Sequence, residues 1–223
     1  MKLVMTLVPG GDADLVEAQV SFHLAAGVDE VVPADSGFDD ATELGADWVF
    51  SCGAGELWWP RGGTLKEVLA VVPRRFGVVR AMVRRFVPRP LGDPFFAERL
   101  TERLAAPEPH VKTLYRPGAD LPLRGWYPVE VFRFPVGTSE QEVIGGTLVT
   151  DTRARDAFRA LREGRSPDFG QPTIDQAYVS DVAALEAEDE GLRAQRRIEQ
   201  LERRLGALEA GVASRLRSRL GLR

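Results

Sequence analysis

The stretch SCGAGELWWPRGG, residues 51–63, places two adjacent indoles next to glycine-rich backbone and a single carboxylate. Glu56 is the one acidic side chain in this stretch. A hard cation such as Mg²⁺ or Mn²⁺ prefers several oxygen ligands, so one carboxylate alone binds it poorly. Two interpretations follow: this stretch borders a binding site, or Gly53 and Gly55 only form a turn at the end of a strand.

Two other side chains have reactive groups but lack the neighbours that would activate them. His23 falls on the apolar side of a predicted helix, which favours a packed and hydrogen-bonded imidazole over a catalytic one. Cys52 has no basic neighbour to lower the pKa of its thiol, so a nucleophilic role is not expected. The chain has one cysteine and two histidines, which excludes a disulfide framework, a zinc ribbon and a histidine-rich metal site.

The elements that position these residues alternate between apolar strands and amphipathic helices. Residues 2–8 form an apolar run typical of a buried parallel strand, and residues 13–26 have apolar side chains at helical spacing. A second strand at 28–34 completes a strand–helix–strand unit, which implies a parallel crossover. Thr64 and Glu67 match a capping box at the start of another helix. Further strands are predicted at 46–52, 76–90 and 129–136, and a further helix at 153–162.

The segment after residue 180 differs from the rest because it contains no proline. Its apolar residues follow steps of three and four, as in the seam of a coiled coil, and they are Ile198, Leu201, Leu205, Leu208 and Val212. Arginines and glutamates flank this seam so that opposite charges face each other in a parallel pair; they are Arg197, Arg204, Glu202 and Glu209. We expect a parallel homodimeric coiled coil over Arg193–Arg215. The alternative is a single amphipathic helix folded back on the domain.

Composition sets the broad class of protein. The formal net charge of −4 argues against a general nucleic-acid binder, because that affinity requires a basic face. No apolar run approaches the roughly 20 residues that span a bilayer, so a cytoplasmic protein is expected. The end of the chain interleaves basic and apolar residues, namely Arg215, Leu216, Arg217, Arg219, Leu220, Leu222 and Arg223. This pattern suits peripheral contact with the inner face of a membrane; the alternative is a solvated end of the coiled coil.

Three segments together resemble the family 2 glycosyltransferases, in particular the bacterial subgroup with a tryptophan pair after its metal motif. The segments are FHLAAGVDEVVPADSGFDDAT, GADWVFSCGAGELWWPRGGTLKEVLAVVP and VEVFRFPVGTSEQ. The resemblance implies an α/β fold: a trimmed GT-A-like (Rossmann-like), mostly parallel sheet with flanking helices, followed by the C-terminal α-helical coiled coil. The expected domains are 1–165 for the GT-A-like part, 166–180 for a linker and 181–223 for the helix.

The resemblance also implies roles for particular residues. Asp35, Gly37 and Asp40 match the family's nucleoside-binding loop, although an Asx-type turn explains them equally. Gly53-Ala54-Gly55-Glu56 stands where the family has Asp-Ala-Asp-Glu, so Glu56 is the candidate catalytic residue and remaining ligand for Mn²⁺ or Mg²⁺. A phosphate role is implied for Arg133, with a surface arginine as the alternative.

Trp58 and Trp59 are the candidates for binding the acceptor, because sugar rings stack on indole faces. Adjacent residues on a strand point to opposite faces, so at most one of them is expected to line the site while the other lies in the core. A structural role for both is the alternative.

Two functions are consistent with this sequence. The first is transfer of a sugar from a nucleoside-diphosphate sugar to a glycan or lipid-linked acceptor, as in polysaccharide biosynthesis. The second is a catalytically inactive relative that acts as a binding or scaffolding protein through its coiled coil.

Overall fold

The computed structural model describes residues 1–8, 10, 13–34, 43–87, 100–135, 146–170 and 175–219. The chain forms two compact units, Met1–Val182 and Ala183–Arg223. The boundary falls close to the expected start of the C-terminal helical part at residue 181.

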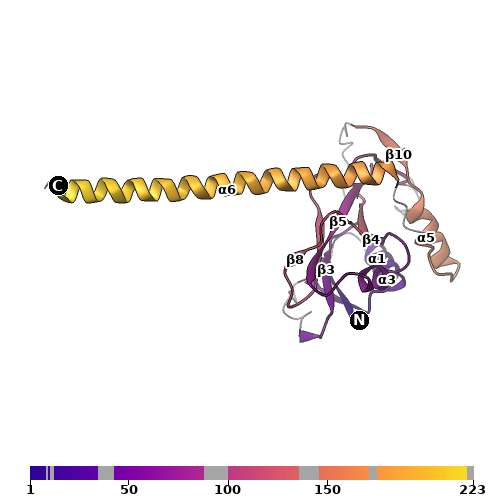
Figure 1. Cartoon of the computed structure of the whole chain (residues 1–223). Helices are drawn as coiled ribbons and strands as arrows, with labels where there is room; N and C mark the ends of the chain where they lie inside the picture. Colours follow the sequence, from indigo (N-terminus) through magenta and orange to yellow (C-terminus); the bar gives the residue numbers. More distant parts are fainter. Residues whose placement is uncertain are drawn as a thin grey trace. The chain divides into compact units, whose positions relative to one another are not determined.

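The first unit combines α-helices and β-strands, as predicted (Figure 1). Its strands are β1 (Leu3–Leu7), β2 (Glu30–Pro33), β3 (Trp48–Cys52), β4 (Glu56–Pro60), β5 (Phe76–Arg85), β6 (Glu102–Leu104), β7 (Lys112–Tyr115), β8 (Leu121–Pro122), β9 (Val129–Arg133) and β10 (Leu148–Thr150). Its helices are α1 (Ala13–Ala25), α3 (Leu65–Ala70) and α5 (Arg153–Arg162). A long helix, α6 (Gln176–Arg219), begins in this unit and continues into the second.

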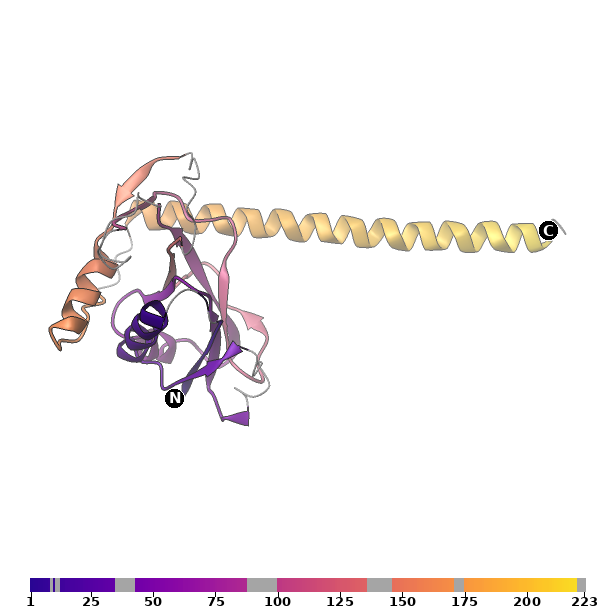
Figure 2. The same cartoon turned by 180° about the vertical axis from the view of Figure 1, so that it is seen from behind.

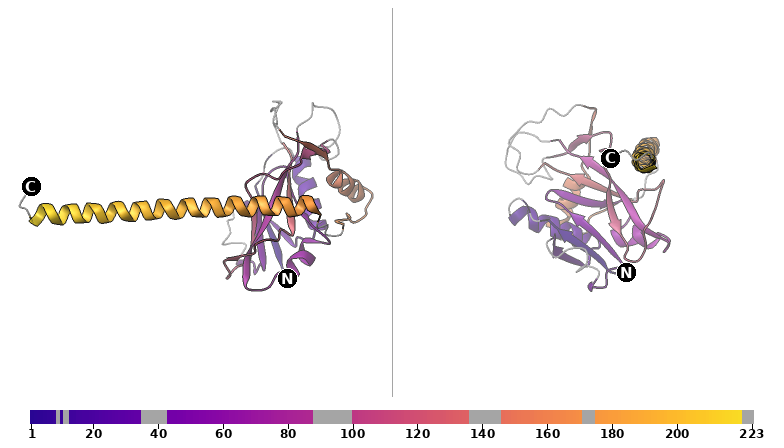
Figure 3. Two further views of the ribbon diagram at one scale, coloured as in Figure 1. Left: turned by 45° about the horizontal axis from the view of Figure 1, so that its top comes forward. Right: turned by 90° about the vertical axis from the view of Figure 1, so that its left-hand side faces the viewer.

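The main sheet has the strand order β2-β1-β3-β7-β5-β9-β4, with β8 beside β5. Strand β1 pairs in parallel with β2 and β3, which confirms the predicted strand–helix–strand unit. Strand β5 also pairs in parallel with β8 and β9. Antiparallel pairs join β3 to β7, β7 to β5 and β9 to β4, so the sheet is mixed. It is strongly curled (Figure 3), and β6 and β10 form a separate two-stranded sheet.

Helices α1 and α3 lie close together against the sheet (Figure 2). The backbone N–H of Leu65 donates to the carbonyl of Ala26, 2.8 Å away, which joins the start of α3 to the end of α1. The predicted capping box is present: the Thr64 hydroxyl accepts from the Glu67 backbone N–H, and the Glu67 carboxylate accepts from the Thr64 N–H at 2.6 Å. This reciprocal pair satisfies two donors that a helix start leaves open.

Several predicted boundaries need correction. Strand β5 ends at Arg85, short of the predicted 90. Residues 176–180, predicted as linker, are helical, because Asp175 accepts the Tyr178 backbone N–H at 2.8 Å and starts α6 there. Pro167 and Phe169 are buried, so this part of the predicted linker packs into the domain.

The second unit is helical throughout residues 183–219. On its seam the side chains of Ile198 and Leu201 are 50% and 53% exposed. The coiled coil itself, and with it the homodimer, stays a prediction. None of the helices in the described ranges is both long and apolar enough to cross a membrane.

Candidate functional site

The turn between β3 and β4 is held together by Glu56. The backbone N–H of Glu56 donates to the carbonyl of Gly53 at 3.2 Å, and its Oε2 accepts the Gly53 N–H at 2.8 Å. Gly55 has a φ of +72°, a conformation that favours glycine. A Cβ on Gly53 would lie 3.1 Å from Glu56 Oε2. Both glycines are therefore matched to the geometry of this turn.

The Glu56 carboxylate is buried, with 5% of the residue exposed, and it is paired with two cations. Lys112 donates its ammonium to Oε2, and Arg133 Nε lies 3.3 Å from Oε1. Arg133 also pairs with Glu108 through Nη1. Both carboxylate oxygens of Glu56 thus have charged partners. A phosphate at Arg133 would have to compete with Glu56 and Glu108, and the phosphate role stays a prediction.

Trp58 and Trp59 are both buried, with 0% and 2% of the residue exposed. The ring of Trp58 packs on Phe50 at 4.6 Å between centroids, and the ring of Trp59 stacks on Phe132 at 5.2 Å. As neighbours on a strand, the two indoles point to opposite faces of β4, and each meets another aromatic ring there. The expectation that Trp58 stacks on an acceptor sugar is wrong, and the structural alternative holds for it.

Helix α1 contributes two polar side chains that bind the β3–β4 region. His23 Nδ1 donates to the carbonyl of Gln19 at 2.6 Å, and Nε2 accepts the Trp58 backbone N–H at 3.1 Å. Complete burial lowers the pKa of His23 to about 4, so the ring is neutral. Gln19 Nε2 donates to the carbonyls of Gly53 and Glu56, both at 2.9 Å. His23 is therefore the packed histidine that the sequence predicted.

Cys52 is also inert, as predicted. Its side chain is fully buried, and burial raises the pKa of the thiol. The predicted nucleoside residues Asp35, Gly37 and Asp40 lie outside the described residues. Within the part of the chain that the structure describes, no three His, Cys, Asp or Glu side chains are grouped as metal ligands would be.

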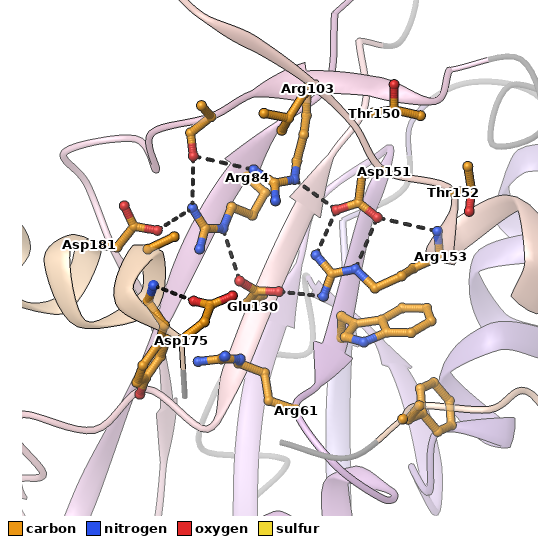
Figure 4. A pocket seen from close by; sticks show the side chains of 17 residues that line it. Arg61, Arg84, Arg103, Glu130, Thr150, Asp151, Thr152, Arg153, Asp175 and Asp181 are labelled. Atoms are coloured by element: carbon orange, nitrogen blue, oxygen red, sulfur yellow. Dashed lines mark hydrogen bonds and ion pairs between the residues drawn. The ribbon is translucent and has the colours of Figure 1, made fainter. Parts of the chain in front are cut away.

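A cavity of about 700 Å³ lies elsewhere on the first unit, over β5 and β9 (Figure 4). The register of the sheet explains why charged residues meet there. Glu130 is opposite both Trp59 and Met82, and Arg84 is two residues after Met82, so these side chains share one face. The lining residues come from β4, β5, β6, β9 and β10, from the segments next to them, from α5, from residues 169–170 and from the first turns of α6. They are Trp59, Arg61, Arg84, Arg103, Ala105, Glu130, Val149, Thr150, Asp151, Thr152, Arg153, Phe169, Gly170, Asp175, Ala177, Tyr178 and Asp181.

A chain of alternating arginines and carboxylates crosses this cavity. Arg84 Nε lies 2.9 Å from Glu130 Oε1, and its Nη1 lies 2.7 Å from Asp181 Oδ2. The other oxygen of Glu130 lies 2.7 Å from Arg153 Nη1. Burial alone raises the pKa of Glu130, but the charges of Arg153 and Arg84 outweigh it and lower that pKa. Glu130 therefore stays ionised although it is only 3% exposed.

Asp151 joins Arg153 to Arg103 at the other end of this chain. Its Oδ2 lies 2.6 Å from Arg153 Nη2 and 2.7 Å from Arg103 Nε, and its Oδ1 accepts Arg153 Nε at 3.0 Å. Burial by itself raises the pKa of Asp151, but the hydrogen bonds and charges of Arg153 and Arg103 lower it to about 2. We call the six residues of this chain the ion network: Asp181, Arg84, Glu130, Arg153, Asp151 and Arg103.

The first turn of α6 closes one side of the cavity. The Tyr178 hydroxyl accepts the Tyr127 backbone N–H at 3.0 Å, and the Arg61 guanidinium lies 3.7 Å from the centre of the Tyr178 ring. Arg84 also donates to the carbonyl of Ala105 at 3.3 Å. Three contacts thus hold the start of α6 in the first unit: the Arg84–Asp181 ion pair, the Tyr127–Tyr178 hydrogen bond and the cation–π contact of Arg61 with Tyr178.

The residues of this cavity were not predicted as a site from the sequence. Its residues are spread over some 120 positions, from Trp59 to Asp181, and no short motif links them. One signal was available: Arg84 and Glu130 fall in predicted buried strands, and a buried charge requires a partner. No protein-family model matches this chain, and comparison with curated proteins finds no significant match. Its assignment to a family therefore stays a prediction.

Proposed function

We propose that the protein is a glycosyltransferase-like relative that acts by binding and does not transfer sugar through its β3–β4 turn. The observation that carries this proposal is the state of Glu56: Lys112 and Arg133 pair with its carboxylate, and Gly53 donates to it. A general base or a metal ligand needs an available oxygen lone pair, and these partners compete for it.

The glycines of the turn also support the proposal. Restoring the family's carboxylates would place a Cβ at Gly53 against Glu56 and at Gly55 on a backbone with φ of +72°. The local geometry thus favours glycine at both positions. The buried indole of Trp58 leaves the turn without the stacking surface that an acceptor sugar would use.

Calorimetric titration of the full chain with UDP and GDP, each with and without Mn²⁺, tests this function. We expect no metal-dependent micromolar binding and no release of nucleotide from UDP-glucose or GDP-mannose. Metal-dependent binding together with turnover that Glu56→Gln abolishes would overturn the proposal.

Such a result would support the transferase as the second candidate. A specific observation favours it: a Cβ on Gly10 would lie 2.7 Å from the Cβ of Ala54. Gly10 thus lies close to the β3–β4 turn, and β1 and β3 are parallel, so both positions follow the carboxyl ends of strands. Open α/β sheets bind their ligands at this edge.

Self-association through α6 is the scaffolding part of the proposal. The seam residues Ile198 and Leu201 are about half exposed, at 50% and 53%, and a coiled coil would cover them. Leu201→Asp should convert the dimer to a monomer in light scattering of the full chain. Gln200→Asp, at an exposed position outside the seam, is the matched control and should leave the molecular mass in solution unchanged. A full-length protein that is monomeric at all concentrations would contradict the scaffolding role.

A further inference from the structure

The charges that line the cavity cancel. Among the described residues it is lined by four arginines and four carboxylates, namely Arg61, Arg84, Arg103, Arg153, Glu130, Asp151, Asp175 and Asp181. The six of the ion network pair with one another at 2.6–2.9 Å. A ligand with a net charge would meet attraction and repulsion from neighbouring groups at similar distances, so it gains little Coulomb energy here.

An apolar ligand is also disfavoured. Arg84, Glu130 and Asp151 still expose 5%, 3% and 7% of their surface, and water in a polar cavity of this size hydrogen-bonds to such exposed polar edges. An apolar occupant would displace this water without replacing its hydrogen bonds, and that costs free energy for each polar group left unpaired.

A hydroxyl group matches this surface because it donates and accepts at once. Asp181 Oδ2 pairs with Arg84, and Asp175 Oδ1 accepts the Tyr178 N–H. A carboxylate has about four acceptor sites, so each of these two can accept further hydrogen bonds. The guanidinium N–H groups supply donors, and so does the Thr150 hydroxyl on the other side of the cavity (Figure 4). Donors and acceptors thus both line the cavity, and a ligand with several hydroxyl groups can use both kinds of group.

We propose that this cavity binds an uncharged, polyhydroxylated ligand such as a short saccharide. Its volume of about 700 Å³ lies within the range of roughly 300–1,000 Å³ that is usual for small-molecule sites. The inference rests on the proposed function only in that the protein acts by binding. The site is separate from the β3–β4 turn, since the lining includes neither Glu56 nor its partners Lys112 and Arg133.

Saturation-transfer NMR on the full chain tests this inference with three groups of probes. The neutral probes are maltose, cellobiose and lactose; the charged probes are glucose 1-phosphate, glucuronate and glucosamine; an N-acetylated tripeptide amide represents neutral ligands without hydroxyls. We expect transfer to at least one neutral saccharide, and at least about ten-fold weaker binding of its charged counterparts and of the peptide.

A blocking variant places the binding in the cavity. Ala177 is exposed on the first turn of α6 and lines the cavity, so Ala177→Trp fills it without removing a charge. Val179 on the same turn is 47% exposed and is not among the lining residues, so Val179→Trp is the matched control. We expect Ala177→Trp to weaken the saccharide at least about ten-fold and Val179→Trp to leave it unchanged.

The outcomes separate the two proposals. No binding of any neutral saccharide, tighter binding of a charged probe or of the peptide, or equal binding by the Ala177→Trp variant would each overturn the inference. None of these results bears on turnover at Glu56. Conversely, sugar transfer that requires Glu56 would overturn the proposed function and leave the saccharide site intact.

Discussion

Replacing Asp151 by asparagine removes one charge from the ion network and keeps the shape of the side chain. The magnitude follows from the pKa of Asp151, which ion pairing lowers from 3.8 to about 2 although burial opposes it. This difference corresponds to roughly 2 kcal/mol of stability at pH 7. Asp151→Asn should therefore lower the free energy of unfolding by about this amount, with Arg153 and Arg103 left without their shared partner.

The pH dependence gives this prediction its sharpest test. Because the folded pKa is lower than the unfolded one, the contribution of Asp151 is complete above pH of about 4 and is lost as the pH falls through about 2. Linkage leaves roughly 1 kcal/mol at pH 3. The difference in stability between wild type and Asp151→Asn should therefore fall by about half from pH 7 to pH 3.

Urea unfolding followed by tryptophan fluorescence measures this difference at each pH. Asp156→Asn is the matched control, because the side chain of Asp156 is 49% exposed and its ion pairs with Arg155 and Arg159 lie at the surface. Exposed pairs contribute less than about 1 kcal/mol. The reasoning is refuted if Asp151→Asn unfolds within about 0.5 kcal/mol of wild type at pH 7, or if the difference does not change at pH 3.

Three further predictions follow from other buried groups. Burial lowers the pKa of His23 from 6.5 to about 4, so the free energy of unfolding of the wild type should fall by about 3 kcal/mol between pH 6.5 and pH 4. In urea unfolding, His23→Gln should lack this part of the pH dependence. An equal change of stability with pH in both proteins would contradict the prediction. Gly77→Ala should lower the free energy of unfolding by more than about 4 kcal/mol in thermal unfolding, because the new Cβ would lie 1.8 Å from the Ala119 carbonyl oxygen. Gly191→Ala is the control. Its Cβ would meet nothing within 4 Å, so it should stabilise α6 by about 0.5–1 kcal/mol. Cys52 is fully buried with a raised thiol pKa, so a thiol reagent should modify it only at the rate of unfolding, and rapid reaction with the folded protein would show that the thiol is accessible.

Local patterns in the sequence were sufficient for the helices and for half of the described strands, whereas β4, β6, β7, β8 and β10 were not among the predicted strand ranges. The 3.6-residue spacing in α1, the capping box of Thr64 and Glu67, and the helix at 153–162 all depend on residues close in the chain, and all three are present. The role of His23 was also predictable, since its place on an apolar helix face requires a hydrogen-bonded ring. The resemblance to glycosyltransferases directed attention to Glu56 and the tryptophans, but it did not indicate what surrounds them.

The tertiary structure alone decided the state of those residues. Glu56 and Lys112 are 56 positions apart, and Glu56 and Arg133 are 77 apart, so no local pattern shows that the carboxylate is already paired. The burial of Trp58 likewise depends on both faces of β4 being covered by elements from other parts of the chain.

The cavity shows the same division between sequence and structure. The sequence determined that Arg84 and Glu130 lie on apolar strands, where an unpaired charge would be costly. The parallel register of β5 with β9 determined that the two meet, and the first turns of α6 supplied Asp181. Periodicity and capping act over a few residues and can be read along the chain, whereas strand register and long-range ion pairs exist only once the sheet has formed.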